Sequence, residues 1–230
     1  MASYVLVHGS FQGGWIWKQV AEKLRAAGHV VYHPSLDGCA ERAHTLRKEI
    51  TLDTQGGEIA GLLFHEDLRD VVLVGTSSGG MVVQRAAELA QDRIKRLVFI
   101  DALVPIPGET VSTINGRPAY DPSQLTYGLK PEEVKEKAFA DLPPTIREWA
   151  VARYTRHPRT PTEEAVDLKA FWAAKWQVDV LRCKRSGAPP EVHQRRTAER
   201  LGGKYSEIDS GHYPMLSNTD EVVKYLLEMA

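Results

Sequence analysis

The stretch Val71-Val72-Leu73-Val74-Gly75-Thr76-Ser77-Ser78-Gly79-Gly80 joins an apolar run to a glycine-rich turn. An uninterrupted apolar run is typical of a strand that is buried on both faces. A helix is predicted directly afterwards, so the chain reverses from strand to helix within a few residues. Gly75 and Gly79 flank Ser77, and their missing side chains leave room for such a bend. The pattern predicts that the Ser77 hydroxyl projects from the turn at the carboxyl edge of a parallel sheet.

The motif Gly-x-Ser-x-Gly also occurs in ordinary strand–helix turns. Here the apolar strand before it and the helix after it favour an exposed nucleophile. Ser78 is the other serine of the turn, but only Ser77 has glycine on both sides at this spacing.

The segments around this turn alternate between strand and helix. Strands are predicted at 4–7, 29–33, 71–74, 94–100, 180–183 and 204–208. Helices are predicted at 15–27, 52–64, 79–90, 190–201 and 219–229. This alternation predicts an α/β fold with a mostly parallel central sheet and helices on both faces.

The segment 105–176 interrupts this alternation. It is rich in proline and shows no clear strand signal, and short helices are predicted at 131–140, 145–154 and 162–174. It is too short to form a domain by itself. We therefore expect a core built from 1–104 and 177–230, with 105–176 inserted as a small helical cap over the sheet.

Composition excludes several classes of protein. The chain has 230 residues, 43% hydrophobic and 26% charged, which is typical of one globular domain. A net charge of −1 gives no general attraction to nucleic acid or to an anionic membrane. The N-terminal residues lack a signal-peptide pattern and no run approaches the ~20 apolar residues of a membrane span, so we expect a cytoplasmic protein. Two cysteines, Cys39 and Cys183, are too few for a disulfide framework.

A serine hydroxyl needs a base within hydrogen-bond reach to act as a nucleophile. His212 follows the last predicted strand and precedes the last helix, which puts it at the same sheet edge as Ser77. The other histidines lack such a position, and we interpret those at 29, 33, 44, 65, 157 and 193 as structural.

Acyl transfer also needs donors for a developing oxyanion. The backbone N–H of Ser78, directly after the nucleophile, is one candidate. The glycine-containing loop after the first strand, 8–14, offers the backbone N–H groups of Ser10 and Phe11.

The segments 8–15, 79–81 and 211–216 resemble those of small α/β-hydrolases related to plant methylesterases and hydroxynitrile lyases. Residues 41–44, 70–75 and 101–105 are closer still to bacterial carboxylesterases of the pyrethroid-hydrolase type. The resemblance implies the α/β-hydrolase fold, ester hydrolysis without cofactor or metal, a Ser–His–acid triad and an apolar pocket between sheet and cap. It assigns Ser77 and His212 as nucleophile and base, and Ser10 and Ser78 as the oxyanion positions.

The chain departs from this family at the acid. The family carries an aspartate after the strand that here ends near Cys183, and Ser186 occupies that position. Asp101 ends the fourth strand at the same sheet edge and keeps the chain order Ser–Asp–His, so we favour it as the acid. Asp209 and a dyad oriented by a hydroxyl or water are the alternatives.

The sequence thus predicts a serine hydrolase that cleaves a small, largely apolar carboxylic ester or lactone through an acyl-enzyme on Ser77. Aromatic residues are candidates for the pocket, although each also suits core packing: Phe11, Trp15, Trp149, Tyr154, Phe171, Trp172 and Trp176. A small-molecule ester is the expected partner, with no nucleic acid or membrane, and a homodimer is left open.

Two other functions stay open. A hydroxynitrile lyase would use the same pair as a base, but the plant lyases of this group carry Thr and Lys where this chain has Gly9 and Tyr213. A non-catalytic ligand-binding protein on the same fold is the second, because the usual acid position holds Ser186.

Overall fold

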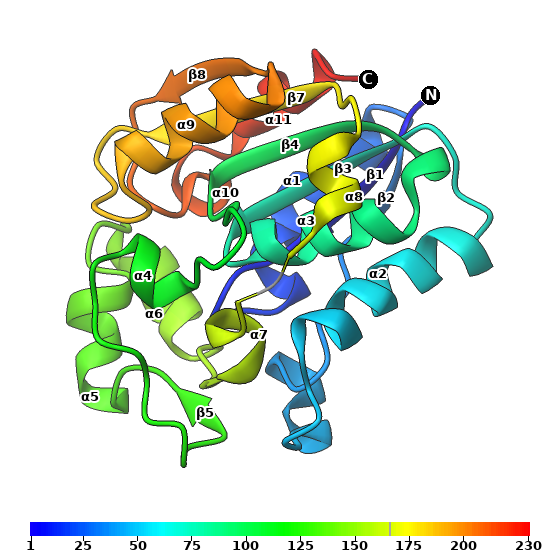
Figure 1. Cartoon of the computed structure of the whole chain (residues 1–230). Helices are drawn as coiled ribbons and strands as arrows, with labels where there is room; N and C mark the ends of the chain where they lie inside the picture. Colours follow the sequence, from blue (N-terminus) through cyan, green and yellow to red (C-terminus); the bar gives the residue numbers. More distant parts are fainter. Residues whose placement is uncertain (166) are drawn as a thin grey trace.

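The computed structural model describes residues 1–165 and 167–230, and a six-stranded parallel sheet forms its centre (Figure 1). The strands are β1 (Ser3–Val7), β2 (Val30–Tyr32), β3 (Val71–Ser77), β4 (Ile94–Ala102), β7 (Val178–Cys183) and β8 (Lys204–Ile208). Their order is β2-β1-β3-β4-β7-β8, and each neighbouring pair is parallel. The predicted fold class is confirmed. β3 and β4 run further than expected, so that they end at Ser77 and just beyond Asp101.

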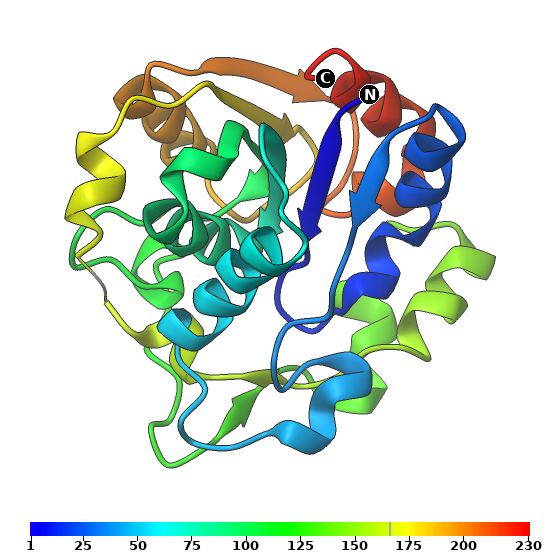
Figure 2. The same ribbon diagram turned by 90° about the vertical axis from the view of Figure 1, so that its right-hand side faces the viewer.

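Successive side chains of each strand point to opposite faces of the sheet, and both faces are buried. In β1, Tyr4 and Leu6 pack in one apolar cluster with the helices α1 (Lys18–Ala26) and α11 (Thr219–Leu227). Val5 and Val7 pack in the other cluster, with α2 (Leu52–His65), α3 (Gly79–Leu89) and α9 (Glu191–Leu201). Figure 2 shows these two helical layers on either side of the strands. This double coverage explains why the strands read as continuous apolar runs.

Short helical segments complete the core. They are η1 (Gly14–Trp17), η2 (Ala40–Thr45), η3 (Gln91–Arg93) and α10 (Pro214–Ser217). α10 begins two residues after His212 and starts with a proline, which suits the first turn of a helix. Within the described residues, no helix has both the length and the apolar character that crossing a membrane requires.

Most of the segment 105–176 lies at one end of the sheet, away from the two chain termini, and its last helix returns along the sheet beside α3 (Figure 1). It contains α4 (Val111–Ile114), β5 (Thr126–Tyr127), α5 (Pro131–Glu133), η4 (Val134–Ala138), α6 (Pro144–Val151), β6 (His157–Pro158), α7 (Thr160–Glu163) and α8 (Lys169–Ala173). β5 and β6 pair antiparallel, so the expectation of no strand here was wrong. Strands of two residues are too short to show an alternating pattern.

The single helix expected at 162–174 is two helices, α7 and α8, and residue 166 lies outside the described residues. Leu168 has φ −90° and ψ 66°, which is outside the helical region, so α8 starts afresh after it. Phe171 of α8 packs into the core cluster beside α3, which ties the end of the insertion to the sheet.

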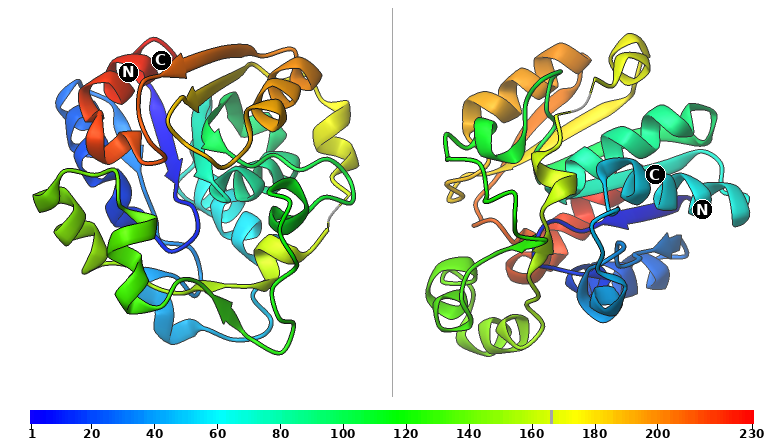
Figure 3. Two further views of the ribbon diagram at one scale, coloured as in Figure 1. Left: turned by 90° about the vertical axis from the view of Figure 1, so that its left-hand side faces the viewer. Right: turned by 60° about the horizontal axis from the view of Figure 1, so that its bottom comes forward.

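The β5–β6 ladder lies beside η2, a segment far away in the sequence (Figures 2 and 3). The amide of Ala40 donates to Thr155 Oγ1 over 3.2 Å, and Cys39 Sγ lies 3.5 Å from His157 Nδ1. These contacts fix the insertion to the edge of the core where the strands end.

Candidate active site

Ser77 ends β3 in a conformation that few residues adopt. Its φ is +53°, in the left-handed region that costs a residue with a side chain free energy. A Cβ added to Gly75 would lie 2.9 Å from the carbonyl oxygen of Gly79, and one added to Gly79 would lie 2.4 Å from that of His8. Neither glycine can therefore carry a side chain without a backbone shift. The strand–turn–helix geometry expected from the sequence is present.

His212 is held by a buried carboxylate. Its Nδ1 donates to Oδ2 of Asp101 over 2.6 Å, and Asp101 is fully buried. The second oxygen, Oδ1, accepts hydrogen bonds from Gln194 Nε2 at 2.8 Å and from the amide of Cys183 at 3.2 Å. Asp101 also has a positive φ of +45°. A buried carboxylate with its oxygens occupied in this way is fixed in position and fixes the imidazole in turn.

The two alternatives for the acid lie differently. Asp209 is mostly exposed and pairs with Arg185 over 2.8 Å. Ser186 Oγ lies 3.4 Å from Nδ1 of His212 and donates to the carbonyl of Ala188 at 2.9 Å. Asp101 is therefore the carboxylate that contacts the histidine.

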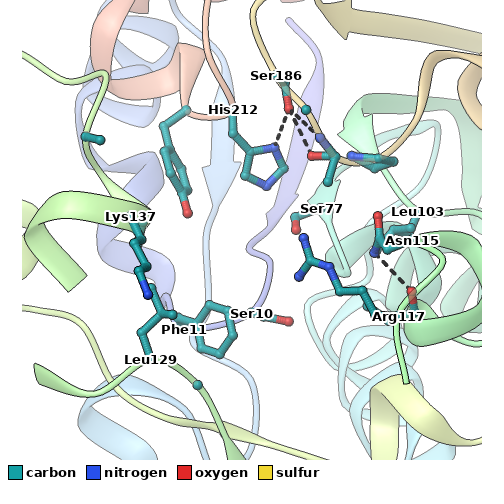
Figure 4. Close-up of a pocket in the computed structure, with 18 of the residues that line it drawn as sticks. Ser10, Phe11, Ser77, Leu103, Asn115, Arg117, Leu129, Lys137, Ser186 and His212 are labelled. Carbon is teal, nitrogen blue, oxygen red and sulfur yellow. Dashed lines mark hydrogen bonds between the residues drawn. The ribbon is translucent and has the colours of Figure 1, made fainter. Parts of the chain in front are cut away.

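Ser77 and His212 line one cavity of about 720 Å³ between the sheet and the insertion. Figure 4 shows both side chains pointing into it. Within the described residues no hydrogen bond joins Ser77 to His212. Such contacts in unliganded enzymes are often long and tighten when substrate binds.

Hydroxyl groups join the loop after β1 to the turn after β3. Ser10 Oγ lies 2.7 Å from Ser78 Oγ and 2.5 Å from the phenol oxygen of Tyr127, which comes from β5 of the insertion. Phe11 has a φ of +69°. In the described part of the chain, the amide N–H groups of Ser10, Phe11 and Ser78 make no hydrogen bond, so they remain available to an oxyanion.

The side chain of His8 holds the loop after β1 in place through two hydrogen bonds. Its ring is fully buried, its Nδ1 donates to the carbonyl of Gly9 at 2.8 Å, and its Nε2 accepts from the amide of Leu36 at 3.0 Å. Burial lowers the pKa of His8 to about 4, so the ring is neutral at pH 7 and fits both contacts. His8 thus has a structural role in this loop and is not among the residues that line the cavity.

Most of the aromatic residues expected in the pocket lie elsewhere. Phe11 lines the cavity, and Tyr154 stacks behind it at 5.3 Å and bonds the amide of Leu129 at 2.7 Å. Trp15 packs edge-on against Trp149 at 5.2 Å, outside the cavity lining. Trp172 and Trp176 surround Phe171 on the other face of the sheet. Most aromatic residues of the insertion pack it against the core. From the sequence pattern alone, such packing residues cannot be distinguished from residues that line a pocket.

Three residues around the site were not anticipated. Gln194 of α9 supports Asp101, Tyr127 contacts Ser10, and Arg117 lines the cavity. None of them stands in a motif. Each reaches the site through the packing of an element far away along the chain, so the sequence held no local signal for them. Among the described residues, no group of three or more His, Cys, Asp or Glu side chains is arranged to hold a metal ion.

This fold and this arrangement of serine, histidine and aspartate define a hydrolase of the α/β class, and comparison with known proteins agrees. The model of the Alpha/beta hydrolase family matches residues 4–225. The chain belongs to the α/β-hydrolase family.

The relatives include esterases. A carbendazim-hydrolyzing esterase of Nocardioides sp. (strain SG-4G) is 41% identical over 114 residues, which are 50% of this chain and 47% of that protein. Methyl jasmonate esterase 1 of Vitis vinifera is 34% identical over 253 residues, covering 98% of this chain and 95% of the relative. This chain therefore spans about half the length of the first relative and nearly all of the second.

The fold matches solved structures over its whole length. An extracellular α/β-hydrolase from a Paenibacillus species superposes with a TM-score of 0.84 and 22% identity, over 99% of this chain and 98% of the other. A pyrethroid hydrolase is among the solved structures with the same fold. By sequence, a methylesterase and a hydroxynitrile lyase of Arabidopsis thaliana are among the relatives, which confirms the resemblance to that group.

Proposed function

We propose that this protein is a carboxylesterase-type serine hydrolase that cleaves a small, largely apolar carboxylic ester or lactone through an acyl-enzyme on Ser77. One observation carries the proposal. His212 is fixed through Nδ1 by the buried Asp101 at 2.6 Å, and its ring shares a cavity with the strained, projecting Ser77. Esterases among the relatives support the same reaction.

The proposed reaction follows from these positions. His212 takes the proton of Ser77 as its Oγ attacks the ester carbonyl, and Asp101 stabilises the imidazolium. The N–H of Ser78, with that of Ser10 or Phe11, receives the oxyanion. His212 then gives its proton to the leaving alcohol. Water, activated by the same imidazole, releases the acid and restores Ser77.

The rival functions have less support. A lyase of the plant type places lysine after the catalytic histidine, whereas this chain has Tyr213, which is buried against Phe139 at a ring distance of 4.8 Å. The ligand-binding alternative rested on the serine at position 186. In our proposal Asp101 supplies the carboxylate for His212, so the serine at position 186 is no longer an argument for a non-catalytic protein.

Other parts of the prediction stay proposals. The reaction as written uses no metal or cofactor, and a small-molecule ester is the partner. A cytoplasmic location and the absence of nucleic-acid or membrane partners rest on the sequence alone, and the homodimer stays open.

A fluorophosphonate probe tests the nucleophile. We expect the wild-type protein to be labelled at Ser77 and to hydrolyse 4-nitrophenyl butyrate, and Ser77→Ala to lose both. Ser123→Ala, which alters an exposed serine of the insertion, is the matched control and should keep both. Release of cyanide from a cyanohydrin without ester turnover would instead identify a lyase, and no labelling with no turnover would indicate a binding protein.

A further inference from the structure

The wall of the cavity that holds Ser77 and His212 carries an excess of positive charge. Its formally charged side chains are three cations and one carboxylate: Arg117, Lys137, Arg185 and Asp141. An ester without charged groups would gain no ion pair from these charged side chains. Their arrangement therefore bears on which substrates the site accepts.

Two of these cations have acidic partners. Lys137 donates to Glu133 one turn earlier on its own segment. Arg185 pairs with Asp209 over 2.8 Å. Over residues 1–165 and 167–230, no carboxylate lies within ion-pair distance of Arg117. Arg117 is thus the cation of this wall whose charge the protein leaves uncompensated.

Arg117 comes from the loop between α4 and β5, and its guanidinium points into the cavity on the side of Ser77 and Ser10 (Figure 4). Lys137 lies across the cavity from it. The neighbouring Tyr120 stacks on Tyr127 at 4.1 Å. Burial raises the pKa of Tyr120, and the positive charge of Arg117 opposes that rise, as expected for adjacent groups.

The single carboxylate of the wall, Asp141, lies away from Arg117. Asp141 comes from the segment that follows Lys137, and its Oδ2 is so close to Gly211 that a Cβ there would lie 1.5 Å from it. Gly211 directly precedes His212. The negative charge of the wall therefore lies beside Gly211, and within the described residues Asp141 makes no ion pair with Arg117.

We infer that Arg117 binds a carboxylate on the substrate, so that the preferred substrates are esters that carry an anionic group at the end of an apolar stem. The inference rests on the proposed esterase function. A guanidinium binds a carboxylate through two parallel hydrogen bonds. Arg117 lines the cavity but is exposed to solvent, so water and salt screen this attraction as they do in a surface ion pair. Phe11, Leu103 and Val111, which also line the cavity, provide contacts for the apolar stem.

Matched ester pairs test the inference. Mono-(4-nitrophenyl) glutarate and 4-nitrophenyl valerate differ only in that a terminal methyl group is replaced by a carboxylate, on the acyl side. The anion of 4-acetoxyphenylacetic acid and 4-ethylphenyl acetate form the corresponding pair on the alcohol side. We expect the wild-type protein to prefer the anionic member of at least one pair by about threefold to fivefold in kcat/KM, and this preference to weaken as salt is added.

In Arg117→Gln this preference should disappear, and Arg117→Lys should restore part of it. Arg153→Gln is the matched control. Arg153 is an exposed arginine of the insertion that stacks over Trp149 at 4.2 Å, outside the cavity lining, and this variant should keep the wild-type preference. Equal or lower rates for the anionic member of both pairs would overturn the inference, as would a preference that Arg117→Gln leaves unchanged.

A binding measurement separates this inference from the proposed function. Calorimetry should detect glutarate binding to the wild-type protein and to Ser77→Ala, and weaker binding to Arg117→Gln. Suppose that the protein neither hydrolyses esters nor reacts with the fluorophosphonate, but still binds glutarate in a way that depends on Arg117. This result would contradict the esterase function and leave the role of Arg117 in place. If the protein is labelled and hydrolyses esters, but neither glutarate binding nor the preference for anionic esters depends on Arg117, only the role of Arg117 would be refuted.

Discussion

Oδ2 of Asp101 and Nδ1 of His212 lie 2.6 Å apart, although 111 positions separate the two residues in the chain. Oγ of Ser186, which stands where the acid was expected, lies 3.4 Å from the same nitrogen. Asp101 belongs to β4 and Ser186 follows β7, and these strands are parallel neighbours. Adjacent parallel strands end at the same edge of the sheet, so a carboxylate on either strand can reach one imidazole.

Asp101→Asn should lower kcat by about 10³–10⁴-fold with little change in KM. An amide cannot stabilise the imidazolium that forms in the transition state, and it favours the wrong tautomer of His212. Steady-state hydrolysis of 4-nitrophenyl butyrate checks this, with circular dichroism as the control for folding. An unchanged kcat would remove Asp101 from the mechanism.

Adding Ser186→Asp to Asp101→Asn should recover part of the lost rate. The new carboxylate would start from a position whose hydroxyl already lies 3.4 Å from Nδ1. Ser186→Ala in the same background is the matched control and should recover nothing. Equal recovery in both double variants would show that position 186 does not reach the imidazole.

Tyr127→Phe should lower kcat by about threefold to tenfold, which corresponds to the loss of one hydrogen bond. The phenol fixes Ser10 Oγ, and Ser10 in turn contacts Ser78, so the loop that carries the oxyanion donors loses one support. Tyr225→Phe is the control, because that hydroxyl is buried without a partner in the described residues. Equal kcat values for the two variants would separate Tyr127 from the oxyanion site.

Gly79→Ala should destabilise the fold by a few kcal/mol and abolish activity, since the new methyl group would lie 2.4 Å from the carbonyl oxygen of His8. Gly57→Ala, in the middle of α2, meets nothing within 4 Å and should stabilise by about 0.5–1 kcal/mol. Denaturant unfolding measures both. A Gly79→Ala protein of wild-type stability would contradict the close approach of α3 to β1.

Stability should fall as the pH is lowered from about 7 to 5, because burial depresses the pKa of several histidines. The pKa values are about 4 for His8 and His193 and about 3 for His157, below the ordinary value of 6.5. In this window the unfolded chain binds protons that the folded protein does not, so acid favours unfolding. Each histidine should cost about 2 kcal/mol between these two pH values.

His157→Leu checks this relationship, since it removes one of the depressed groups from a buried site. The pH dependence of the melting temperature should become shallower than in the wild-type protein. His44→Leu, which alters an exposed histidine, should keep the wild-type slope. A steeper or unchanged slope in His157→Leu would contradict a neutral, buried ring at that position.

The local pattern was enough to determine the sheet and the turn that carries Ser77. Apolar runs fix strands that are covered on both faces, and glycines at 75 and 79 fix the bend, because both effects act within a few residues. The edge at which His212 lies also followed from chain order, since parallel strands all end on one side.

The choice of the acid, the walls of the cavity and the supports of the site depended on tertiary structure. Asp101 and Asp209 both stood at strand ends, and only the packing of β4 against β7 buries the first, while the second is exposed beside Arg185. Gln194 and Arg117 come from a helix and a loop whose orientation the pattern leaves free. Contacts between segments that are distant in the sequence depend on how side chains pack throughout the core. No short stretch of sequence carries the information that determines this packing.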